Sequence, residues 1–290
     1  MASTVTARTN RSGILWLVAT PIGNLADLTP RATEILGSVG LVCCEDTRRT
    51  GKLLHLAGIT APPMAVCNEH TEHDLIDRVL DSLGAGDDVA IVSDAGTPGI
   101  SDPGERIVAA AVAAGATITP VPGACAAVAG LIASGLPTGR WVMEGFVPRS
   151  GPERRKRIEE IAAEQRTVVL YEAPHRLART VSDLADACGA DRRVTIAREL
   201  TKMHEEFIHG ALGTIDIGEP RGEYVIVLDG RHVDRTPPDD DIIRAAVDAE
   251  IAAGASRRDA AATVAKRLGV PRRVTYDLTI GNRSISEPSE

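Results

Sequence analysis

The chain has 290 residues, a formal net charge of −8 at neutral pH, and 43% hydrophobic but only 2% aromatic residues. This length allows one large or two medium domains, with a core built from Ala, Val, Leu and Ile. No apolar run approaches the ~20 residues of a membrane span, and the polar residues 1–12 lack the apolar centre of a signal peptide. The five cysteines, an odd number without Cys-x-x-Cys spacing, argue against a disulfide framework or a zinc cage and indicate the reducing cytoplasm.

From residue 14 to about residue 137, short apolar runs alternate with segments of helical periodicity. Continuous apolar runs are typical of strands buried on both faces, which implies a parallel sheet covered by helices on both sides. Thr29 before Pro30 predicts a capped helix start, and Asp102 before Pro103 predicts another helix that ends near Ala114. The other expected elements are strands 14–19, 41–44, 64–67, 89–93 and 117–121 and helices 75–83 and 124–134.

The pattern resets near residue 138. Here the later apolar runs follow one another without helices, so we expect a mixed sheet. The expected strands are 141–146, 167–171, 193–197, 206–209 and 224–228, with helices over 152–164 and 174–188. The sequence therefore predicts an α/β protein with a tail (1–12), an N-terminal α/β cofactor domain (13–137), a second α/β domain (138–230), a linker (231–241), a helical tail (242–283) and a flexible end (284–290).

Three short helices are expected in the helical tail, over 240–253, 256–268 and 272–280. The last two are joined by Leu268-Gly-Val-Pro271, which resembles a helix-turn-helix hairpin. Such hairpins more often simply pack than bind nucleic acid, and an acidic protein is an unusual nucleic-acid binder. Residues 251–283, however, carry seven basic and two acidic side chains, and 154–157 form a second basic cluster. Each cluster alone is typical of a solvated helix face, but together they favour a polyanionic partner.

Three loops rich in Gly and Pro are expected at the carboxyl ends of the first sheet, where α/β proteins bind ligands. They are 20–24, 94–104 and 120–125. Asp94 ends its strand and is able to accept hydrogen bonds from a ribose diol, while helix 124–134 begins with free backbone N–H groups. An ordinary strand-to-helix connection is the alternative. Neither a G-x-G-x-x-G nor a P-loop motif is present, so dinucleotide and NTPase functions lack their phosphate cradle.

Two further segments of the second half are candidates: 170–176, where a strand ends and a helix begins, and 197–206, which is dense in polar and ionisable groups. A salt-bridged turn is the alternative interpretation of the latter. The acidic and His-rich segment 69–74 resembles a metal cluster, but no third ligand is fixed and Asn68 is a good helix cap, so we expect no metal. Cys43 and Cys44 lie in an apolar strand and are expected to be buried, inert thiols.

A resemblance adds to these observations. The runs 18–27, 45–50, 93–104, 121–124, 171–176 and 198–202 together resemble the ribosomal RNA small subunit methyltransferase I family, and the likeness covers about residues 13–283. It implies two α/β domains of the tetrapyrrole methylase type (class III) with S-adenosyl-L-methionine between them, and usually a homodimer. It also implies 2′-O-methylation of a cytidine ribose in the decoding region of 16S rRNA.

The resemblance assigns residues to roles as well. It implies that the cofactor is bound by Pro21, Asp94, Thr97, Ala124, Cys125, Tyr171 and Ala173, and that a late strand, 222–226, closes the pocket. Because a ribose hydroxyl is a weak acid, a base or a cation would help the reaction. Among Glu172, His175, Glu199 and Lys202 we select Lys202 and Glu199, which lie in the densest polar cluster.

The expected partner is 16S rRNA or the small ribosomal subunit, with no membrane and no DNA. The arginines expected to contact RNA phosphates are Arg48, Arg49, Arg154, Arg155, Arg157, Arg257, Arg258, Arg272 and Arg273. Two alternatives stay open: a methylase of this fold acting on a tetrapyrrole or a protein side chain, and a non-catalytic RNA-binding ribosome-assembly factor. The basic segments argue against the first, and the three converging loops argue against the second.

Overall fold

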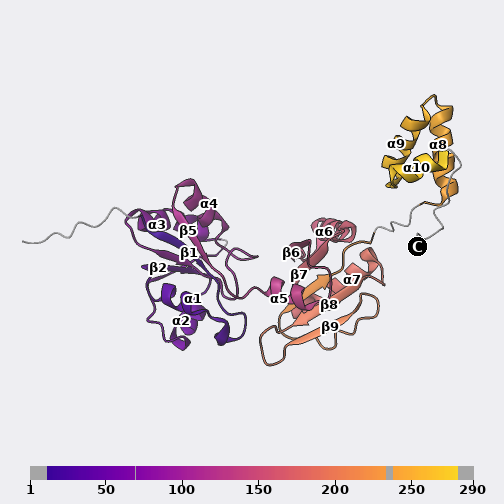
Figure 1. Cartoon of the computed structure of the whole chain (residues 1–290). Coiled ribbons are helices and arrows are strands. Elements are labelled where there is room, and N and C mark those ends of the chain that lie inside the picture. The colour runs from indigo at the N-terminus through magenta and orange to yellow at the C-terminus, as the bar shows by residue number, and fades with distance from the viewer. Residues whose placement is uncertain (1–11, 69, 233–237, 280–290) are drawn as a thin grey trace, which may run out of the picture. The chain divides into compact units, whose positions relative to one another are not determined.

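The computed structural model describes residues 12–68, 70–232 and 238–279. The chain divides into two compact units, Met1–Arg231 and His232–Glu290 (Figure 1). Most of the predicted N-terminal tail, residues 233–237 of the predicted linker and the predicted flexible end lie outside the described residues. Among the described helices, none is long and apolar enough to cross a membrane.

The first sheet of unit 1 is entirely parallel, in the order β3-β2-β4-β1-β5. Its strands are β1 (Ile14–Val18), β2 (Leu41–Cys44), β3 (Met64–Val66), β4 (Val89–Ile91) and β5 (Thr117–Val121). Helices α1 (Pro30–Leu36) and α2 (Thr47–Leu56) cover one face, and α3 (Glu72–Gly84) and α4 (Glu105–Ala113) cover the other. A short 3-10 helix, η1 (Leu25–Asp27), follows β1. Strands β2 and β4 are buried along their whole length, as predicted, whereas β1, β3 and β5 are only partly buried. The buried central strands give the loops at their carboxyl ends firm anchors.

The start of α4 differs from the sequence prediction. A helix was expected from Asp102–Pro103, but the loop continues through Gly104, whose φ is 122°, and α4 begins at Glu105. The buried carboxylate of Glu72 caps this start, because its Oε1 accepts hydrogen bonds from the N–H groups of Gly104, Arg106 and Ile107 at 3.1, 2.7 and 3.2 Å. Glu72 lay in the segment that resembled a metal cluster, and its carboxylate caps a helix instead.

The second sheet is mixed, as the sequence predicts, and the structure gives its strand order as β6-β7-β10-β8-β9. Only β6 and β7 run parallel; the other neighbours are antiparallel. The strands are β6 (Trp141–Phe146), β7 (Thr167–Glu172), β8 (Arg193–Arg198), β9 (Glu206–Ala211) and β10 (Tyr224–Leu228). Helices α6 (Gly151–Ala163) and α7 (Pro174–Cys188) pack on one face.

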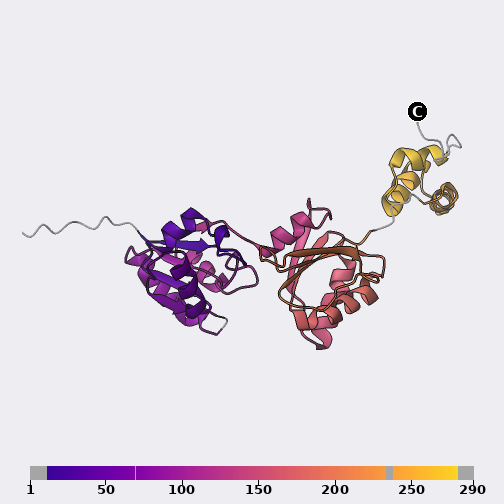
Figure 2. The ribbon, with the colours of Figure 1, turned by 90° about the horizontal axis from the view of Figure 1, so that it is seen from below.

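Helix α5 (Ala126–Ala133) covers the other face of this second sheet. The sequence places α5 within the cofactor domain 13–137, whereas in the structure it packs against β7 and β10 (Figures 1 and 2). Gly130 allows the close approach, since an added Cβ there would lie 2.8 Å from Cγ1 of Val225. The connection from β5 to α5 therefore carries the chain from the first sheet to the second.

Unit 2 is a three-helix unit of α8 (Asp240–Ala252), α9 (Arg257–Leu268) and α10 (Arg272–Thr279). Its small core contains Ile243, Val247, Val264 and Leu278. Helix α9 is capped by Ser256, whose side chain accepts from the N–H of Asp259 at 3.2 Å. It ends at Gly269, which has the left-handed φ of 66° that favours glycine. The hairpin of α9 and α10 predicted from the sequence is therefore present.

Candidate functional site

The three Gly- and Pro-rich loops of the first sheet meet, as predicted, and backbone contacts hold them together. Thr20 and Gly96 exchange N–H···O bonds of 2.8 and 3.1 Å, and the hydroxyl of Thr97 donates to the carbonyl of Ala124 at 3.0 Å. Gly96 has a φ of 91°, and a Cβ there would lie 3.2 Å from Ile22. Glycine is therefore required where the loops cross.

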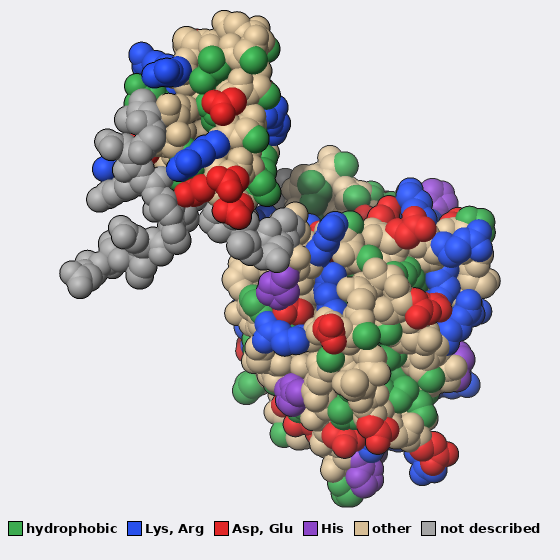
Figure 3. All heavy atoms as spheres, turned by 90° about the vertical axis from the view of Figure 1, so that its right-hand side faces the viewer, with side chains coloured by type: hydrophobic (Ala, Val, Ile, Leu, Met, Phe, Trp, Pro, Cys, Tyr) green, Lys and Arg blue, Asp and Glu red, His purple; other side chains and the backbone are tan. Residues whose placement is uncertain are grey.

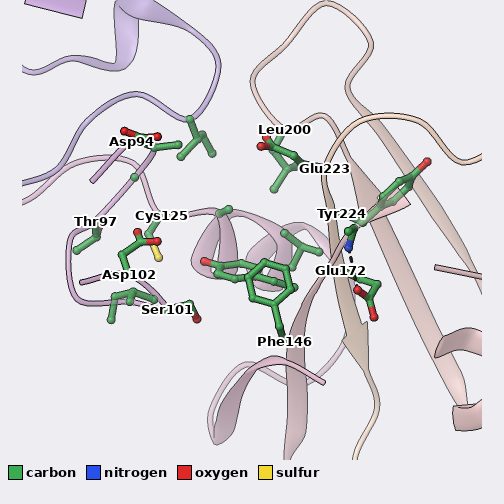
Figure 4. Close-up of a pocket in the computed structure, with 18 of the residues that line it drawn as sticks. Asp94, Thr97, Ser101, Asp102, Cys125, Phe146, Glu172, Leu200, Glu223 and Tyr224 are labelled. Carbon is green, nitrogen blue, oxygen red and sulfur yellow. Dashed lines mark hydrogen bonds between the residues drawn. The ribbon is translucent and has the colours of Figure 1, made fainter. Parts of the chain in front are cut away.

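These loops and the second sheet enclose a cavity of about 420 Å³, which we call the Asp94 pocket. In Figure 4 the side chains of Asp94, Thr97 and Asp102 lie on one side, and those of Glu172, Leu200 and Glu223 lie on the other. Of the residues predicted to bind a cofactor, Asp94, Thr97, Cys125, Tyr171 and Ala173 line the pocket. Pro21 and Ala124 do not line it, but their neighbours Ile22 and Cys125 do.

The carboxylate of Asp94 is held by the start of α2. The N–H of Asp46 donates to its Oδ1 at 3.2 Å, and a guanidinium nitrogen of Arg49 lies 3.3 Å from its Oδ2. The N–H of Asp94 in turn donates to Oε1 of Glu45 at 2.9 Å. Arg49, predicted to bind RNA, thus lines the pocket and pairs with Asp94. The segment 45–49 fixes the orientation of this aspartate.

An aromatic wall closes the opposite side of the pocket. Tyr171 and Phe146 lie with their ring centroids 5.6 Å apart, and the Tyr171 hydroxyl accepts from the N–H of Ala127 at 3.2 Å. Burial raises the pKa of Tyr171 to about 12, so the phenol stays neutral. Phe146 is missed by the sequence analysis. The sequence offers one indication of its importance, which is that the chain has only two phenylalanines.

Behind this wall lies a buried charged network. The carboxylate of Glu172 accepts from the hydroxyl of Thr180 at 2.6 Å and lies 3.2 Å from Nε of Arg176. Arg176 also donates to the carbonyl of Val147. The side chain of Arg154 is 4% exposed and pairs with Asp183 at 2.6 Å. The network joins α6 and α7 to the end of β7.

The position of Arg154 corrects a sequence prediction. Arg154 was expected to contact RNA, but its guanidinium donates to Thr180 and to the carbonyl of Pro148, each at 3.0 Å. The basic cluster was interpreted as one exposed face. On an α-helix, however, Arg154 shares a face with Ile158 and Ile161, which are buried. Arg154 therefore stabilises the fold and is not available to a phosphate.

Five carboxylates and one cation line the Asp94 pocket: Glu45, Asp94, Asp102, Glu172, Glu223 and Arg49. Burial and the nearby negative charges of Glu45 and Asp94 together raise the pKa of Asp102 to about 7, against the opposing effect of a hydrogen bond with Ser93. Asp102 and Glu45 lie within the segments quoted for the resemblance, but nothing in the sequence marked them as pocket residues. Asp102 and Glu45 are recognisable as pocket residues only in the folded structure, because the loops that carry them meet there.

Lys202 and Glu199 are not in the lining of this pocket, but both contact the lining residue Glu223, and Leu200 next to Glu199 also lines it. The Nζ of Lys202 lies 2.9 Å from Glu199 and 2.7 Å from Glu223. Burial lowers the pKa of Lys202, but the hydrogen bonds to Glu223 and Glu199 outweigh it and the pKa is raised. Burial raises the pKa of Glu199, but the hydrogen bonds that its carboxylate accepts from Lys202 and from the N–H of Glu223 outweigh this effect, and the pKa is lowered. Lys202 is thus a cation at neutral pH.

The backbone around Lys202 is held in an unusual conformation. Glu199 and Thr201 have left-handed φ values of 50° and 66°, a region that non-glycine residues seldom adopt and that often marks functional sites. The Lys202 stem packs on Gly23 in the first loop, where a Cβ would lie 2.4 Å from Cγ. The segment 199–202 therefore reaches the loop that follows β1.

The remaining predicted RNA contacts are exposed or half-exposed. Arg48 pairs with Asp46 at 2.8 Å, and Arg157 pairs with Glu144 at 2.6 Å. The other five of these predicted contacts are exposed, namely Arg155, Arg257, Arg258, Arg272 and Arg273. On the faces that Figure 3 shows, basic and acidic side chains are interspersed, so no broad field of one sign marks an RNA surface there.

Comparison with known proteins gives consistent matches. The family described as Tetrapyrrole (Corrin/Porphyrin) Methylases matches residues 14–216. The protein named ribosomal RNA small subunit methyltransferase I of Synechocystis sp. is 45% identical over 273 residues, which cover 92% of this chain and 98% of that protein. Proteins with the same name from Escherichia coli O157:H7 and Bacillus subtilis are 41% and 39% identical, covering 92% and 91% of this chain and 94% and 93% of theirs.

Solved structures support the same fold. The methyltransferase CobJ matches with a TM-score of 0.57 at 21% identity, covering 77% of this chain and 97% of that one. Diphthine synthase matches with a TM-score of 0.56 at 18% identity, covering 75% and 90%. At these identities the structures show the architecture alone: a parallel sheet followed by a mixed one.

Proposed function

Because this chain belongs to the ribosomal RNA small subunit methyltransferase I family, within the tetrapyrrole methylases, we propose that it methylates a ribose 2′-hydroxyl of a cytidine in the decoding region of 16S rRNA. It is an S-adenosyl-L-methionine-dependent rRNA methyltransferase. The observation that carries the proposal is the Asp94 pocket, in which five segments of the resemblance converge on one cavity.

The pocket fits this cofactor in charge and in shape. S-adenosylmethionine carries a sulfonium and an ammonium against one carboxylate, and the pocket offers five carboxylates and one guanidinium. Its aromatic and aliphatic side chains, among them Phe146, Tyr171, Ile22 and Val225, suit the apolar faces of an adenine ring. A volume of about 420 Å³ lies within the range of small-molecule sites.

We assign the residues of the pocket to parts of this ligand as follows. Asp94 accepts hydrogen bonds from polar hydrogens of the cofactor, and the segment 45–49 keeps its carboxylate in place. Thr97, Cys125, Tyr171 and Ala173 form the walls. Ala124 acts indirectly, because its carbonyl orients Thr97, and Pro21 acts through its neighbour Ile22. When bound, the cofactor supplies an electrophilic methyl group.

Lys202 is proposed to act on the ribose hydroxyl at the rim of the pocket. Its charge, held by Glu199 and Glu223, would stabilise negative charge that develops on the hydroxyl oxygen, as preorganised cations do. Glu199 then keeps the lysine charged and in position rather than accepting a proton, since a carboxyl with a lowered pKa is a weak base. The remaining lowering of the activation barrier comes from the exclusion of water by both sheets and from the alignment of the reacting atoms.

The arginines of unit 2 and the exposed Arg48 and Arg155 are proposed to contact the phosphates of 16S rRNA or of the small ribosomal subunit. We further propose that the protein works in the cytoplasm and as a homodimer, the assembly that the family resemblance implies. Neither the protomer interface nor the location is needed for the chemistry of the pocket.

Two measurements test the function. Calorimetric titration with S-adenosylmethionine is expected to show binding that Asp94→Asn weakens, whereas Asp27→Asn, an exposed aspartate outside the pocket lining, leaves it intact. Ribose-methylation mapping of 16S rRNA from a strain lacking the gene is expected to lose one cytidine signal in the decoding region, restored by wild type and not by Asp94→Asn.

The rival functions give different results. A ribosome-assembly factor would show no cofactor binding. A methylase of tetrapyrroles or protein side chains would bind the cofactor and leave every ribose methylation of 16S rRNA in place. Loss of a base methylation instead of a ribose methylation would keep the rRNA substrate and overturn the 2′-O assignment.

A further inference from the structure

Two of the five carboxylates in the Asp94 pocket have no ion pair among the described residues, and these two are Asp102 and Glu45. The other three are compensated by nearby cations, in the pairs Asp94–Arg49, Glu223–Lys202 and Glu172–Arg176. An uncompensated, partly buried carboxylate costs free energy in the empty protein. A ligand that brings a positive charge to it recovers that cost.

Asp102 is held in the pocket from both sides along the chain. Ser101 before it has a left-handed φ of 63°, and its hydroxyl would lie 3.1 Å from a Cβ placed at Gly145 in β6. Gly104 after it is fixed by the hydrogen bond to Glu72. The backbone on both sides of Asp102 is therefore constrained, and Figure 4 shows its carboxylate beside Cys125 at the start of α5.

The groups around Asp102 come from several loops. The negative charges of Glu45 and Asp94 raise the pKa of Asp102, and a side-chain hydrogen bond with Ser93 lowers it. The charge of Asp102 in turn raises the pKa of Tyr171. Cys125 lies beside Asp102, and Arg49, the one cation of the lining, is engaged with Asp94. The carboxyl thus titrates near neutral pH because it is buried close to two other acids, with a pKa of about 7.

We propose that Asp102, together with Glu45, is the specificity determinant that recognises the positive charge by which the methyl donor differs from its demethylated product. The proposal rests on the function proposed above and deepens it. S-adenosylhomocysteine keeps the adenosine and the amino acid of the donor but has a neutral sulfur. A charged Asp102 therefore favours the donor over the product, which assists product release.

A linked proton follows from this assignment. A bound cation lowers the pKa of Asp102, so the complex holds fewer protons than the free protein at neutral pH. Affinity for the donor then rises with pH through the free-state pKa of about 7. If the pKa in the complex falls well below 6, affinity rises about eightfold between pH 6 and pH 7.5. The product, without the sulfonium, shows much less of this rise.

The experiment is calorimetry of the full chain with three probes: S-adenosylmethionine, S-adenosylhomocysteine, and sinefungin, whose amine replaces the methylsulfonium. Titration at pH 7 in two buffers of different ionisation enthalpy gives the number of protons that are released when each probe binds. For both cationic probes we expect release of about half a proton at pH 7, because a carboxyl with a pKa of about 7 is half protonated in the free protein at that pH. We also expect the affinity of both probes to rise about eightfold between pH 6 and pH 7.5. Asp102→Asn should abolish both the proton release and the rise of affinity with pH. It should also reduce the ratio of donor affinity to product affinity at pH 7.5 by about tenfold, which is the size of one screened charge interaction.

Two further variants complete the experiment, the first as a control and the second as a test of the Asp102–Glu45 pair. Glu105→Gln makes the same charge change at an exposed position three residues away and is expected to behave as wild type. Glu45→Gln removes the negative neighbour while keeping an oxygen for the Asp94 N–H. It should move the midpoint of the pH dependence to lower pH, which tests the pair even if Asp102→Asn fails to fold.

Each contrary outcome has a distinct meaning. Equal proton release for donor and product would overturn the proposal, as would an Asp102→Asn variant that keeps the donor-to-product ratio but loses turnover. The latter would place Asp102 on the ribose hydroxyl instead. Absence of binding by all three probes would overturn the proposed function itself, whereas binding without the charge preference would leave that function standing.

Discussion

Replacing Arg154 by alanine should destabilise unit 1 by about 3 kcal/mol, although a second arginine lies next to it in the chain. Removal of one partner from a buried ion pair usually costs about 3–5 kcal/mol. The low end applies because the Asp183 side chain left behind is 35% exposed and regains water. Thr180 keeps its bond to Glu172, while the carbonyl of Pro148 loses its donor, a loss of about 1 kcal/mol within that total.

Equilibrium urea unfolding measures this directly. The two tryptophans of the chain, Trp16 and Trp141, both lie in unit 1, so their fluorescence reports that unit without interference from the three-helix unit. With a slope of about 2–3 kcal/mol per molar urea, the midpoint should fall by about 1–1.5 M. Arg155→Ala, at the exposed neighbouring position, should change stability by less than about 0.5 kcal/mol.

A loss below about 1 kcal/mol for Arg154→Ala, at unchanged slope, would refute the reasoning. It would mean that water or a neighbouring side chain replaces the guanidinium inside the network. A comparable loss for Arg155→Ala would also contradict it, because the difference between the two positions would then not lie in burial.

Three other predictions follow from the same structure. Lys202→Met should lower turnover by about 10²–10³-fold with a donor Kd within about twofold of wild type, and Lys202→Arg should recover part of it; near-normal turnover with saturating RNA would exclude the proposed role. Charge reversal at Arg257 and Arg258 in α9 should weaken RNA binding and reduce the slope of log affinity against log salt by about 1–2, while calorimetry shows the donor affinity intact; unchanged RNA binding would leave unit 2 a packing role. Burial raises the pKa of Cys43 and Cys67 to about 12, so at pH 8 a disulfide reagent should not titrate them in the native protein, whereas urea exposes all five thiols; rapid native labelling of Cys43 would contradict the burial.

Much of the fold of this protein was readable from local patterns. Continuous apolar runs separated by helical periods predict a parallel sheet, since the two periods differ and need no tertiary information. The run of strands without helices after residue 190 indicates the mixed second sheet. Asp94 and the glycines after it mark a ligand loop because turn chemistry is local as well. These signals placed most strands within two residues of their observed bounds.

Contacts between distant segments decided the rest. Arg49 and Arg154 look like any exposed arginine in the sequence, and only their partners Asp94 and Asp183 show that one lines the pocket and the other is buried. Helix α5 follows the first sheet in the chain yet packs on the second. The acidity of Asp102 depends on Glu45 and burial, which exist only once the loops have met. Periodicity and turn residues are properties of neighbours in sequence, whereas charge compensation and burial are properties of neighbours in space.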